Sequence, residues 1–169
     1  ADYWAHTIQV NLIGAFLCCK AVLPVMLAQD RGKIVNMSGI GGRHSSAYGV
    51  SKAGVVYLTQ VLAAELEGKN IQVNAMSPGS IHTRMWEETT EAARTIGDAD
   101  LYKYGRNVLT GGGASMERAA ELAVFLGGDL SGKLSGRLIR AVSDDFRTIT
   151  SRIPEIMTSD AYTVGRIEP

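Results

Sequence analysis

The stretch KIVNMSGIGGRHSSAYGVSK, residues 33–52, decides the fold that the sequence predicts. Its first five residues form an apolar run that is typical of a short buried strand. Residues 38–46 are rich in glycine and serine and predict a loop. A helix is expected to begin at Ser46 and to carry Tyr48 and Lys52, four residues apart. A strand, a loop and a helix in this order indicate a layered α/β fold.

Tyr48 and Lys52 are expected to lie one turn apart on the same face of that helix, with the ammonium close to the phenol. A cation about 5 Å from the phenolate, at an effective dielectric of about 20, stabilises it by roughly 3 kcal/mol, or about two units of pKa. Such a tyrosine can exchange a proton near neutral pH. The alternative is a surface pair that merely shares a helix face, and the spacing alone does not decide between the two.

Composition and charge narrow the class of protein. The 169 residues are 46% hydrophobic and 20% charged, which is ordinary for one globular domain. Seventeen basic and seventeen acidic residues give no net charge, so we expect no nucleic-acid partner. The adjacent Cys18 and Cys19 lie in an apolar helical pattern and are expected to be buried thiols. We find no run of roughly 20 uninterrupted apolar residues and no basic leader, so we expect no membrane partner and a cytoplasmic location.

Predicted helices and strands alternate along the chain. Helices are expected at residues 3–29, 46–67, 85–96 and 116–126, and strands at residues 33–37, 71–76 and 136–142. This order predicts parallel strands joined by helical crossovers, with ligands bound beyond the carboxyl ends of the strands. Asn11 lies inside the first helix, where it is either a tolerated polar residue or a functional one. A kink is expected at Pro24.

We treat residues 1–169 as one partial domain with four portions: a catalytic portion at 1–83, a substrate flap at 80–113, a last helix and strand at 115–142, and a carboxyl-terminal tail at 143–169. The triple glycine that ends the flap is predicted to be a linker, because no strand precedes it. The flap carries Trp86, Tyr102 and Tyr104, which fit an apolar or aromatic substrate or the flap's own packing. Asp144 and Asp145 are expected to be surface charges, and no metal site is predicted.

Four segments together resemble the short-chain dehydrogenase/reductase family: Asn11 in a long helix, VNMSG at 35–39, YGVSKAG at 48–54 and VNAMSPGSIHT at 73–83. They occur in the family's order and cover most of the chain. The resemblance implies a Rossmann-type doubly wound parallel sheet and an oxidoreductase that transfers hydride between NAD or NADP and an alcohol or carbonyl substrate. It also implies a homodimer or homotetramer, in which the helices at 3–29 and 46–67 pair across a dimer axis.

The resemblance also assigns roles to single residues. Tyr48 would be the general acid/base, Lys52 would lower its pKa and hold the nicotinamide ribose, and Asn11 would anchor a water in a proton relay. The residues that would line the nicotinamide are Pro78, Gly79, Ile81 and Thr83.

The sequence departs from the family's pattern in the site loop. Gly39 stands where the family's substrate-orienting serine is expected. Either Ser38, Ser45 or Ser46 takes over that role, or the site lacks the hydroxyl, and loss of one such donor commonly lowers the rate by about two to three orders of magnitude. His44 is expected to be a solvated loop residue.

The family's amino-terminal half, which carries the glycine-rich pyrophosphate turn and the residue that selects NAD or NADP, is not in this sequence. The sheet is therefore expected to be incomplete, and the family's glycine pair after the last strand is also missing. The alternative function is a catalytically incompetent fragment that acts as a helix-mediated subunit-packing module.

Overall fold

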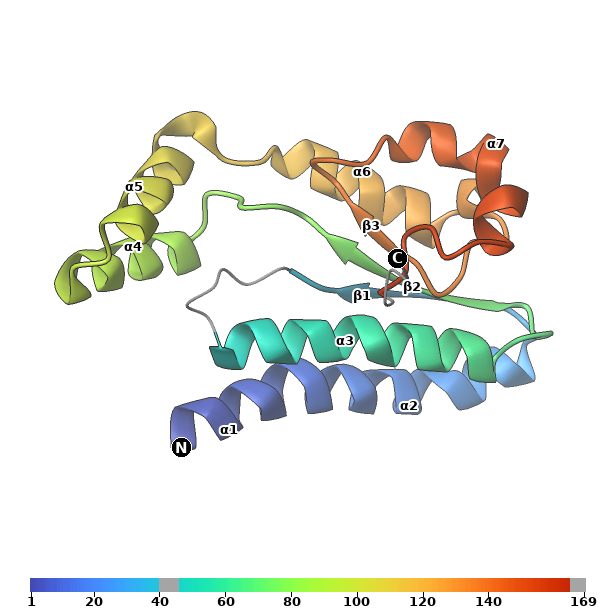
Figure 1. Ribbon diagram of the computed structural model, residues 1–169. Helices are drawn as coiled ribbons and strands as arrows, with labels where there is room; N and C mark the ends of the chain where they lie inside the picture. The colour runs from blue at the N-terminus through green and yellow to red at the C-terminus, as the bar shows by residue number, and fades with distance from the viewer. Residues whose placement is uncertain (40–45, 165–169) are drawn as a thin grey trace, which may run out of the picture.

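Three parallel strands form the centre of the computed structural model, which describes residues 1–39 and 46–164 (Figure 1). They are β1 (Gly32–Met37), β2 (Ile71–Ser77) and β3 (Leu138–Arg140), hydrogen-bonded in the order β1-β2-β3. The register places Met37 beside Met76 and Ser77 beside Arg140. Because all three strands run the same way, their carboxyl ends meet at one edge of the sheet.

Helices cover both faces of this sheet (Figure 1). One face carries α1 (Asp2–Ile8), the π-helical turn η1 (Gln9–Ile13), α2 (Gly14–Ala28) and α3 (Ser46–Glu65). The other face carries α6 (Met116–Gly127), the 3-10 turn η3 (Asp129–Ser131) and α7 (Phe146–Met157). The flap consists of α4 (Arg84–Ile96), α5 (Ala99–Asn107) and the turn η2 (Val108–Gly112), and it extends past the carboxyl end of β2. The predicted partial, doubly wound α/β fold is therefore confirmed.

The core lies on both sides of β2. Six consecutive residues of β2 are buried, as expected for a parallel strand with helices on both faces. The cluster on the α3 side comprises Cys19, Ile34, Leu62, Leu66, Ile71 and Val73. The larger cluster on the other side comprises Met76, Ala119, Leu122, Phe125, Leu126, Leu134, Ile139, Ala141, Phe146, Ile149, Ile153 and Ile156. β3 is shorter than predicted, because Gly136 has a φ of +72°, outside the strand region.

Only one of the two cysteines is buried. Cys19 is 2% exposed and its thiol donates to Asn36 Oδ1 at 3.7 Å, whereas Cys18 is exposed. The prediction of two buried thiols is therefore wrong for Cys18. Neighbouring residues of a helix point about 100° apart, so only one of them can face the core.

The helix Asp2–Ala28 is long and apolar enough, by length and composition, to cross a membrane. Gln9, Asn11 and Lys20 interrupt its apolar residues, so the sequence observation that no uninterrupted apolar run of roughly 20 residues exists still holds. The core helix of a soluble protein passes the same test. This helix contacts α3 and β1 on one side, so the expected absence of a membrane partner stays a prediction.

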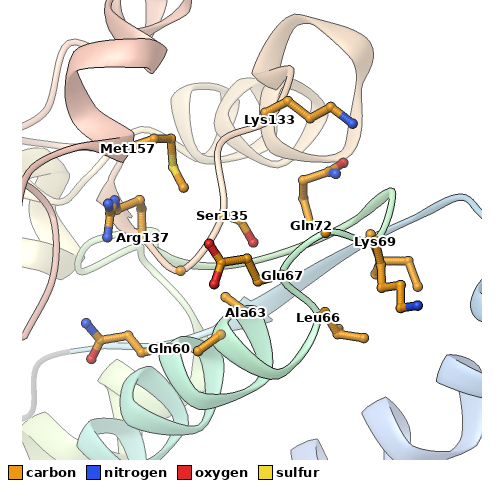
Figure 2. Close-up of a pocket in the computed structure, with 14 residues that line it drawn as sticks. Gln60, Ala63, Leu66, Glu67, Lys69, Gln72, Lys133, Ser135, Arg137 and Met157 are labelled. Carbon is orange, nitrogen blue, oxygen red and sulfur yellow. The ribbon is translucent and has the colours of Figure 1, made fainter.

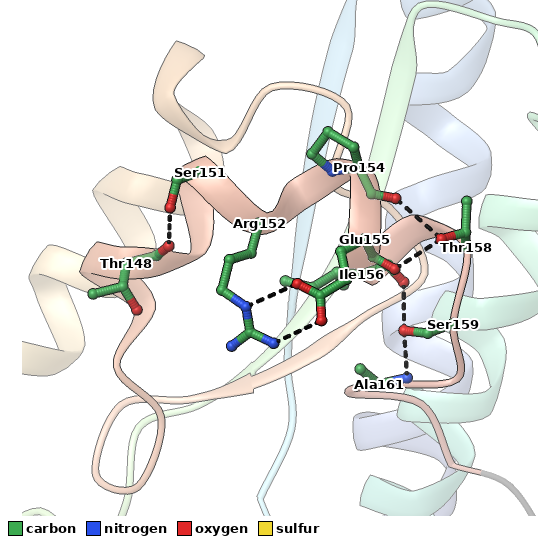
Figure 3. A network of polar contacts seen from close by, with 9 residues as sticks. All are labelled: Thr148, Ser151, Arg152, Pro154, Glu155, Ile156, Thr158, Ser159 and Ala161. Carbon is green, nitrogen blue, oxygen red and sulfur yellow. Dashed lines mark hydrogen bonds and ion pairs between the residues drawn. The ribbon is translucent and has the colours of Figure 1, made fainter.

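The predicted tail contains a packed helix. Four apolar residues of α7 (Phe146, Ile149, Ile153 and Ile156) recur at helical spacing and are buried against α6 and β3. The Tyr162 carbonyl accepts a hydrogen bond from Leu138 N at 2.8 Å, so the segment after α7 also covers the outer edge of β3. Figure 3 shows the end of α7, where the Thr158 hydroxyl donates to the Glu155 carbonyl at 3.0 Å. Residues 143–164 are thus an integral part of the domain.

We expect Ile149→Ala to lower the free energy of unfolding by about 2–4 kcal/mol, because it removes a buried side chain and leaves a cavity between α7 and α6. Denaturant unfolding followed by circular dichroism measures this loss. Val124→Ala is the matched control, because Val124 is 75% exposed and should change stability by less than about 0.5 kcal/mol. Equal stability of the two variants would contradict the packing of α7.

Candidate active site

The carboxyl ends of the three strands meet as the sequence predicted. Ser38 N donates to the Met76 carbonyl at 2.8 Å, and Ala141 N donates to the Ser77 carbonyl at 2.8 Å. Gly79 has a φ of +86°, and a Cβ there would lie 2.5 Å from Val142 Cγ2. Both observations restrict this position to glycine. The turn after β2 therefore packs directly on the segment after β3.

Tyr48 and Lys52 lie in the first two turns of α3, beside the end of β1. Lys52 Nζ donates to the Met37 carbonyl at 3.0 Å and lies 5.7 Å from the centroid of the Tyr48 ring. Both side chains are half-buried. Burial raises the pKa of Tyr48 and lowers the pKa of Lys52, because it disfavours the charged form of each. Burial is the cause of the raised pKa of Tyr48, and the Lys52 ammonium donates to the Met37 carbonyl, so the lowering of the Tyr48 pKa by Lys52 stays a prediction.

We expect Tyr48 to titrate above its ordinary pKa of 10.0. The folded chain then holds this proton more tightly than the unfolded chain does. The resulting contribution to stability is complete below about pH 10 and is lost as the pH rises through the folded-state value. NMR of ¹³Cζ-labelled tyrosine measures the transition, and Tyr48→Phe assigns the resonance. A transition of Tyr48 below pH 10 would show that Lys52 controls the phenol after all.

Asn11 reaches α3 from the π-helical turn η1. Its Nδ2 donates to Ser51 Oγ at 3.0 Å, and Ser51 Oγ donates to the Tyr48 carbonyl at 2.7 Å. A π-helical turn displaces one residue from the regular helix, and such turns are frequent at functional sites. Leu12 packs where a side chain on Gly54 would lie, at 2.8 Å from the Cβ position, so the two helices approach closely. Asn11 is thereby connected to the backbone of the candidate catalytic turn.

Sequence reasoning assigned no role to Ser51, which is fully buried between Asn11 and Tyr48. The signal available in the sequence was its position in the segment YGVSK, one residue before Lys52. A serine at this place on a helix can bond its own backbone, and the partner on the first helix becomes evident only when the two helices pack together.

Two positions after β1 bear on which hydroxyl would orient a substrate. The buried Ser38 hydroxyl donates to the Lys52 carbonyl at 3.3 Å, so it joins β1 to α3. A Cβ on Gly39 would lie 3.0 Å from Tyr48 Oη, which places position 39 directly beside the phenol. Ser46 is exposed at the start of α3, and Ser45 and His44 lie outside the described residues.

The turn after β2 leads into the flap. Pro78 is half-buried at the end of β2, and Ile81 packs against the larger core cluster. Thr83 is exposed at the start of α4, where its carbonyl accepts from Trp86 N at 2.8 Å. Its hydroxyl makes no capping hydrogen bond. The Thr83 hydroxyl is therefore not used to cap α4, and its contact with a nicotinamide stays a prediction.

Aromatic and polar contacts hold the flap helices to each other and to the turn after β2. Tyr104 Oη lies 2.9 Å from Ser80 Oγ, and its ring lies 5.3 Å from the Trp86 ring, centroid to centroid. These contacts tie α5 to the turn after β2. The flap contains the helix α5, which the sequence did not predict.

One of the two carboxylates after β3, that of Asp144, has a structural role. Asp144 Oδ2 accepts from Arg140 N at 2.7 Å and so closes the turn. This corrects the expectation of a mere surface charge. Within residues 1–39 and 46–164, no group of three or more His, Cys, Asp or Glu side chains is placed to hold a metal ion.

The fold and this arrangement define a parallel α/β protein with a tyrosine–lysine pair at the carboxyl edge of its sheet. Residues 1–141 match the family model described as enoyl-(acyl carrier protein) reductase. The chain is 37% identical over 142 residues to 3-oxoacyl-(acyl-carrier-protein) reductase FabG of Thermotoga maritima, covering 80% of this chain and 54% of that protein. It is also 37% identical to (2S)-((R)-hydroxy(phenyl)methyl)succinyl-CoA dehydrogenase subunit BbsD of Thauera aromatica, covering 80% of this chain and 53% of that one.

Two solved structures resemble the fold. An NAD⁺-bound xylitol dehydrogenase superposes with a TM-score of 0.72 at 31% identity, over 82% of this chain and 58% of that one. An actinorhodin polyketide ketoreductase with NADPH superposes with a TM-score of 0.73 at 29% identity, over 83% and 58%. The chain belongs to the short-chain dehydrogenase/reductase family. It spans about half the length of the curated relatives that it matches.

Proposed function

We propose that the chain carries the catalytic and substrate-binding portion of an NAD- or NADP-dependent oxidoreductase that acts on an alcohol or carbonyl substrate. One observation carries this proposal. The Tyr48 hydroxyl faces position 39 at the carboxyl edge of the sheet, with Lys52 one turn further along the same helix. A proton donor and a cation beside the open ends of parallel strands are what reduction of a bound carbonyl requires.

The residues present fit a nicotinamide cofactor. Lys52 uses one hydrogen bond, to the Met37 carbonyl, out of the three that an ammonium can donate. The exposed Thr83 hydroxyl is not engaged in capping α4. Lys52 and Tyr48 would hold the ribose, and the residues that would line the nicotinamide are Pro78, Gly79, Ile81 and Thr83. The bound cofactor supplies or accepts hydride at the carbon of the substrate's carbonyl or alcohol.

The proton moves through Tyr48. Burial keeps the phenol in its neutral form, because the pKa is raised, so in the reductive direction Tyr48 Oη can donate its proton to the carbonyl oxygen. Asn11 and Ser51 hold the turn that carries Tyr48 and would anchor a water that returns the proton. Ser38 fixes the same turn to β1 through the Lys52 carbonyl, which makes it a positioning residue in this proposal.

The substrate class follows from the flap and from the relatives. Trp86 and Tyr104 contact each other with tilted rings beside the turn after β2 and offer an apolar wall. The relatives include proteins named for 3-oxoacyl thioester reduction and for a hydroxy(phenyl)methyl-bearing CoA thioester. A carbonyl panel for assay therefore contains 3-oxoacyl thioesters and apolar and aromatic ketones.

Cofactor binding tests the proposed function. Titration of the chain with NADH and with NADPH should enhance the cofactor's fluorescence or quench the emission of Trp4 and Trp86, and saturation should identify the preferred cofactor. The absence of any signal at millimolar cofactor would contradict the proposal for this chain and favour the alternative, a subunit-packing module.

Assembly through the first helices is part of the proposal. The outer faces of these helices expose large apolar side chains, among them Val10, Leu17, Val25, Tyr57 and Val61. An exposed apolar face of this kind is typical of a protein–protein interface, and a homodimer or homotetramer that pairs α2 with α3 would cover it. Light scattering of the Leu17→Glu variant, compared with the natural chain, tests this assembly.

The cytoplasmic location expected from the sequence stays a prediction.

A further inference from the structure

Arg118 lies at a helix position where local chemistry disfavours a cation. It is the third residue of α6, and its backbone N donates to Oγ of the capping residue Ser115 at 3.1 Å. Carboxylates and side-chain amides favour this position, since the amino end of a helix carries a partial positive charge. The contacts that explain the arginine are therefore expected outside α6.

The guanidinium of Arg118 binds the main chain after β3. Its Nε donates to the Ala141 carbonyl, and its Nη2 donates to the Asp144 carbonyl at 3.1 Å. The guanidinium carbon lies 5.3 Å from the centroid of the Phe146 ring, within the range of a cation–π contact. One rigid, planar group thus spans two carbonyls, an arrangement that a lysine ammonium does not reproduce.

These two carbonyls belong to a closed turn at residues 140–144, which we call the β3 turn. Asp144 N donates to the Arg140 carbonyl at 3.1 Å, and Asp144 Oδ2 accepts from Arg140 N at 2.7 Å. Val142 lies in the middle of this turn and is 61% exposed. The shape of the β3 turn is fixed by its own hydrogen bonds, and its place against α6 is fixed by Arg118.

The β3 turn packs on the turn after β2 and on the end of the flap. Val142 Cγ2 lies 2.5 Å from the Cβ position of Gly79, and Ala114 Cβ lies 2.7 Å from the same position. Ala114 N donates to the Ser80 carbonyl at 2.9 Å, so the two ends of the flap are joined. Val142, Gly79 and Ala114 therefore meet where the flap joins the sheet, and we call this place the flap hinge.

We propose that Arg118 is a positioning residue of the candidate active site. Through the β3 turn it holds Val142 against Gly79 and Ala114, and so fixes the flap hinge and the turn that would line the nicotinamide. Arg118 acts through this turn and not by contact with the substrate. Its effect on turnover rests on the proposed function, whereas its effect on the flap hinge does not.

Arg137, at the other end of β3, supplies a matched control. Figure 2 shows its side chain beside a pocket formed by the end of α3, the amino end of β2 and the segment that leads into β3. Arg137 Nη2 donates to the carbonyls of Ile156 at 2.9 Å and Ser159 at 3.0 Å. Arg118 and Arg137 are both half-buried and each binds two main-chain carbonyls, but Arg118 acts at the carboxyl edge of the sheet and Arg137 at the amino edge.

Amide hydrogen exchange without cofactor tests the flap hinge in the natural protein and in Arg118→Met. Methionine keeps the apolar part of the side chain and donates no hydrogen bond. The Gly136 amide, which donates to the Val73 carbonyl at 2.7 Å at the other end of β3, serves as the reference. Exchange at Ala114 should accelerate about tenfold or more relative to Gly136, because the loss of two charge-assisted hydrogen bonds frees the β3 turn.

Turnover separates a positioning role from a purely structural one. With the carbonyl panel and saturating cofactor, kcat per folded molecule should fall about tenfold to 10²-fold in Arg118→Met, because a shift of the turn at Gly79 misaligns the reacting atoms. It should stay within about twofold in Arg137→Met, although that variant also loses two hydrogen bonds. Arg118→Lys keeps the cation and should recover only part of the loss, and it replaces Arg118→Met in both measurements if the methionine variant does not fold.

Three results would overturn the proposal. They are equal acceleration of exchange at Ala114 and Gly136 in Arg118→Met, equal kcat in Arg118→Met and Arg137→Met, and full recovery of kcat in Arg118→Lys, which would show that the charge alone suffices. If the natural protein reduced no carbonyl of the panel, the proposed function would be contradicted, and exchange at Ala114 would decide whether Arg118 holds the flap hinge.

Discussion

Tyr48→Phe is expected to lower kcat for carbonyl reduction by about 10²–10⁴-fold, because it removes the phenolic hydroxyl that lies beside position 39 at the carboxyl edge of the sheet. The phenol is half-buried and makes no hydrogen bond to any other described residue, so unfolding transitions of the variant should stay close to those of the natural protein. The cofactor's Kd should rise far less than kcat falls, because Lys52 and the residues after β2 still hold the nicotinamide end, and this difference separates a loss of proton transfer from a loss of binding.

The matched control is Tyr57→Phe. Tyr57 lies on the same helix and is 66% exposed, so loss of its hydroxyl should leave kcat unchanged. If Tyr48→Phe retained activity within a few-fold of the natural protein, Tyr48 would not be the general acid/base. The proton would then have to come from another group near the strand ends.

Gly39→Ser is expected to raise kcat by up to about 10²-fold, because it places a second hydroxyl beside the phenol. A Cβ at this position would lie 3.0 Å from Tyr48 Oη, so the phenol must move by a few tenths of an ångström to accept it. The gain is expected because a second donor to the carbonyl oxygen stabilises the charge that develops there in the transition state.

Gly39→Ala separates the two effects of this substitution. It adds the same Cβ and the same crowding without a hydroxyl, so it should be no faster than the natural protein. A serine variant that is no faster than the alanine variant would indicate that another hydroxyl, from Ser38, Ser45 or Ser46, already orients the substrate. Steady-state rates with the carbonyl panel measure all three proteins side by side.

The sequence predicted the layers of the fold because its signals are local. The apolar run before Ser38 and the small residues after Pro78 are strand and turn signals that need no knowledge of the rest of the chain. The helix α7 was missed, although Phe146, Ile149, Ile153 and Ile156 carry the spacing of a buried helix face. The family resemblance ends before this helix, and Pro154 inside it argues against a helix by local rules.

The candidate site was predicted in its residues and less well in its electrostatics. The spacing of Tyr48 and Lys52 fixes the helix face that they share. It does not reveal that the Met37 carbonyl holds the ammonium or that burial opposes ionisation of the phenol. Likewise, the hydrogen bond from Asn11 to Ser51 forms only because the first helix packs closely against α3 at Gly54. The order of residues in the sequence does not reveal this packing.

Transfer of deuterium from a reduced nicotinamide cofactor labelled at C4 tests the central claim most directly. The protein is incubated with the labelled cofactor and the carbonyl panel, and the alcohol products are analysed by mass spectrometry. The proposed site predicts an alcohol that carries one deuterium at the former carbonyl carbon, formed by the natural protein and reduced about 10²-fold or more with Tyr48→Phe. No labelled alcohol above background with any carbonyl of the panel, or equal labelling by the two proteins, would contradict it.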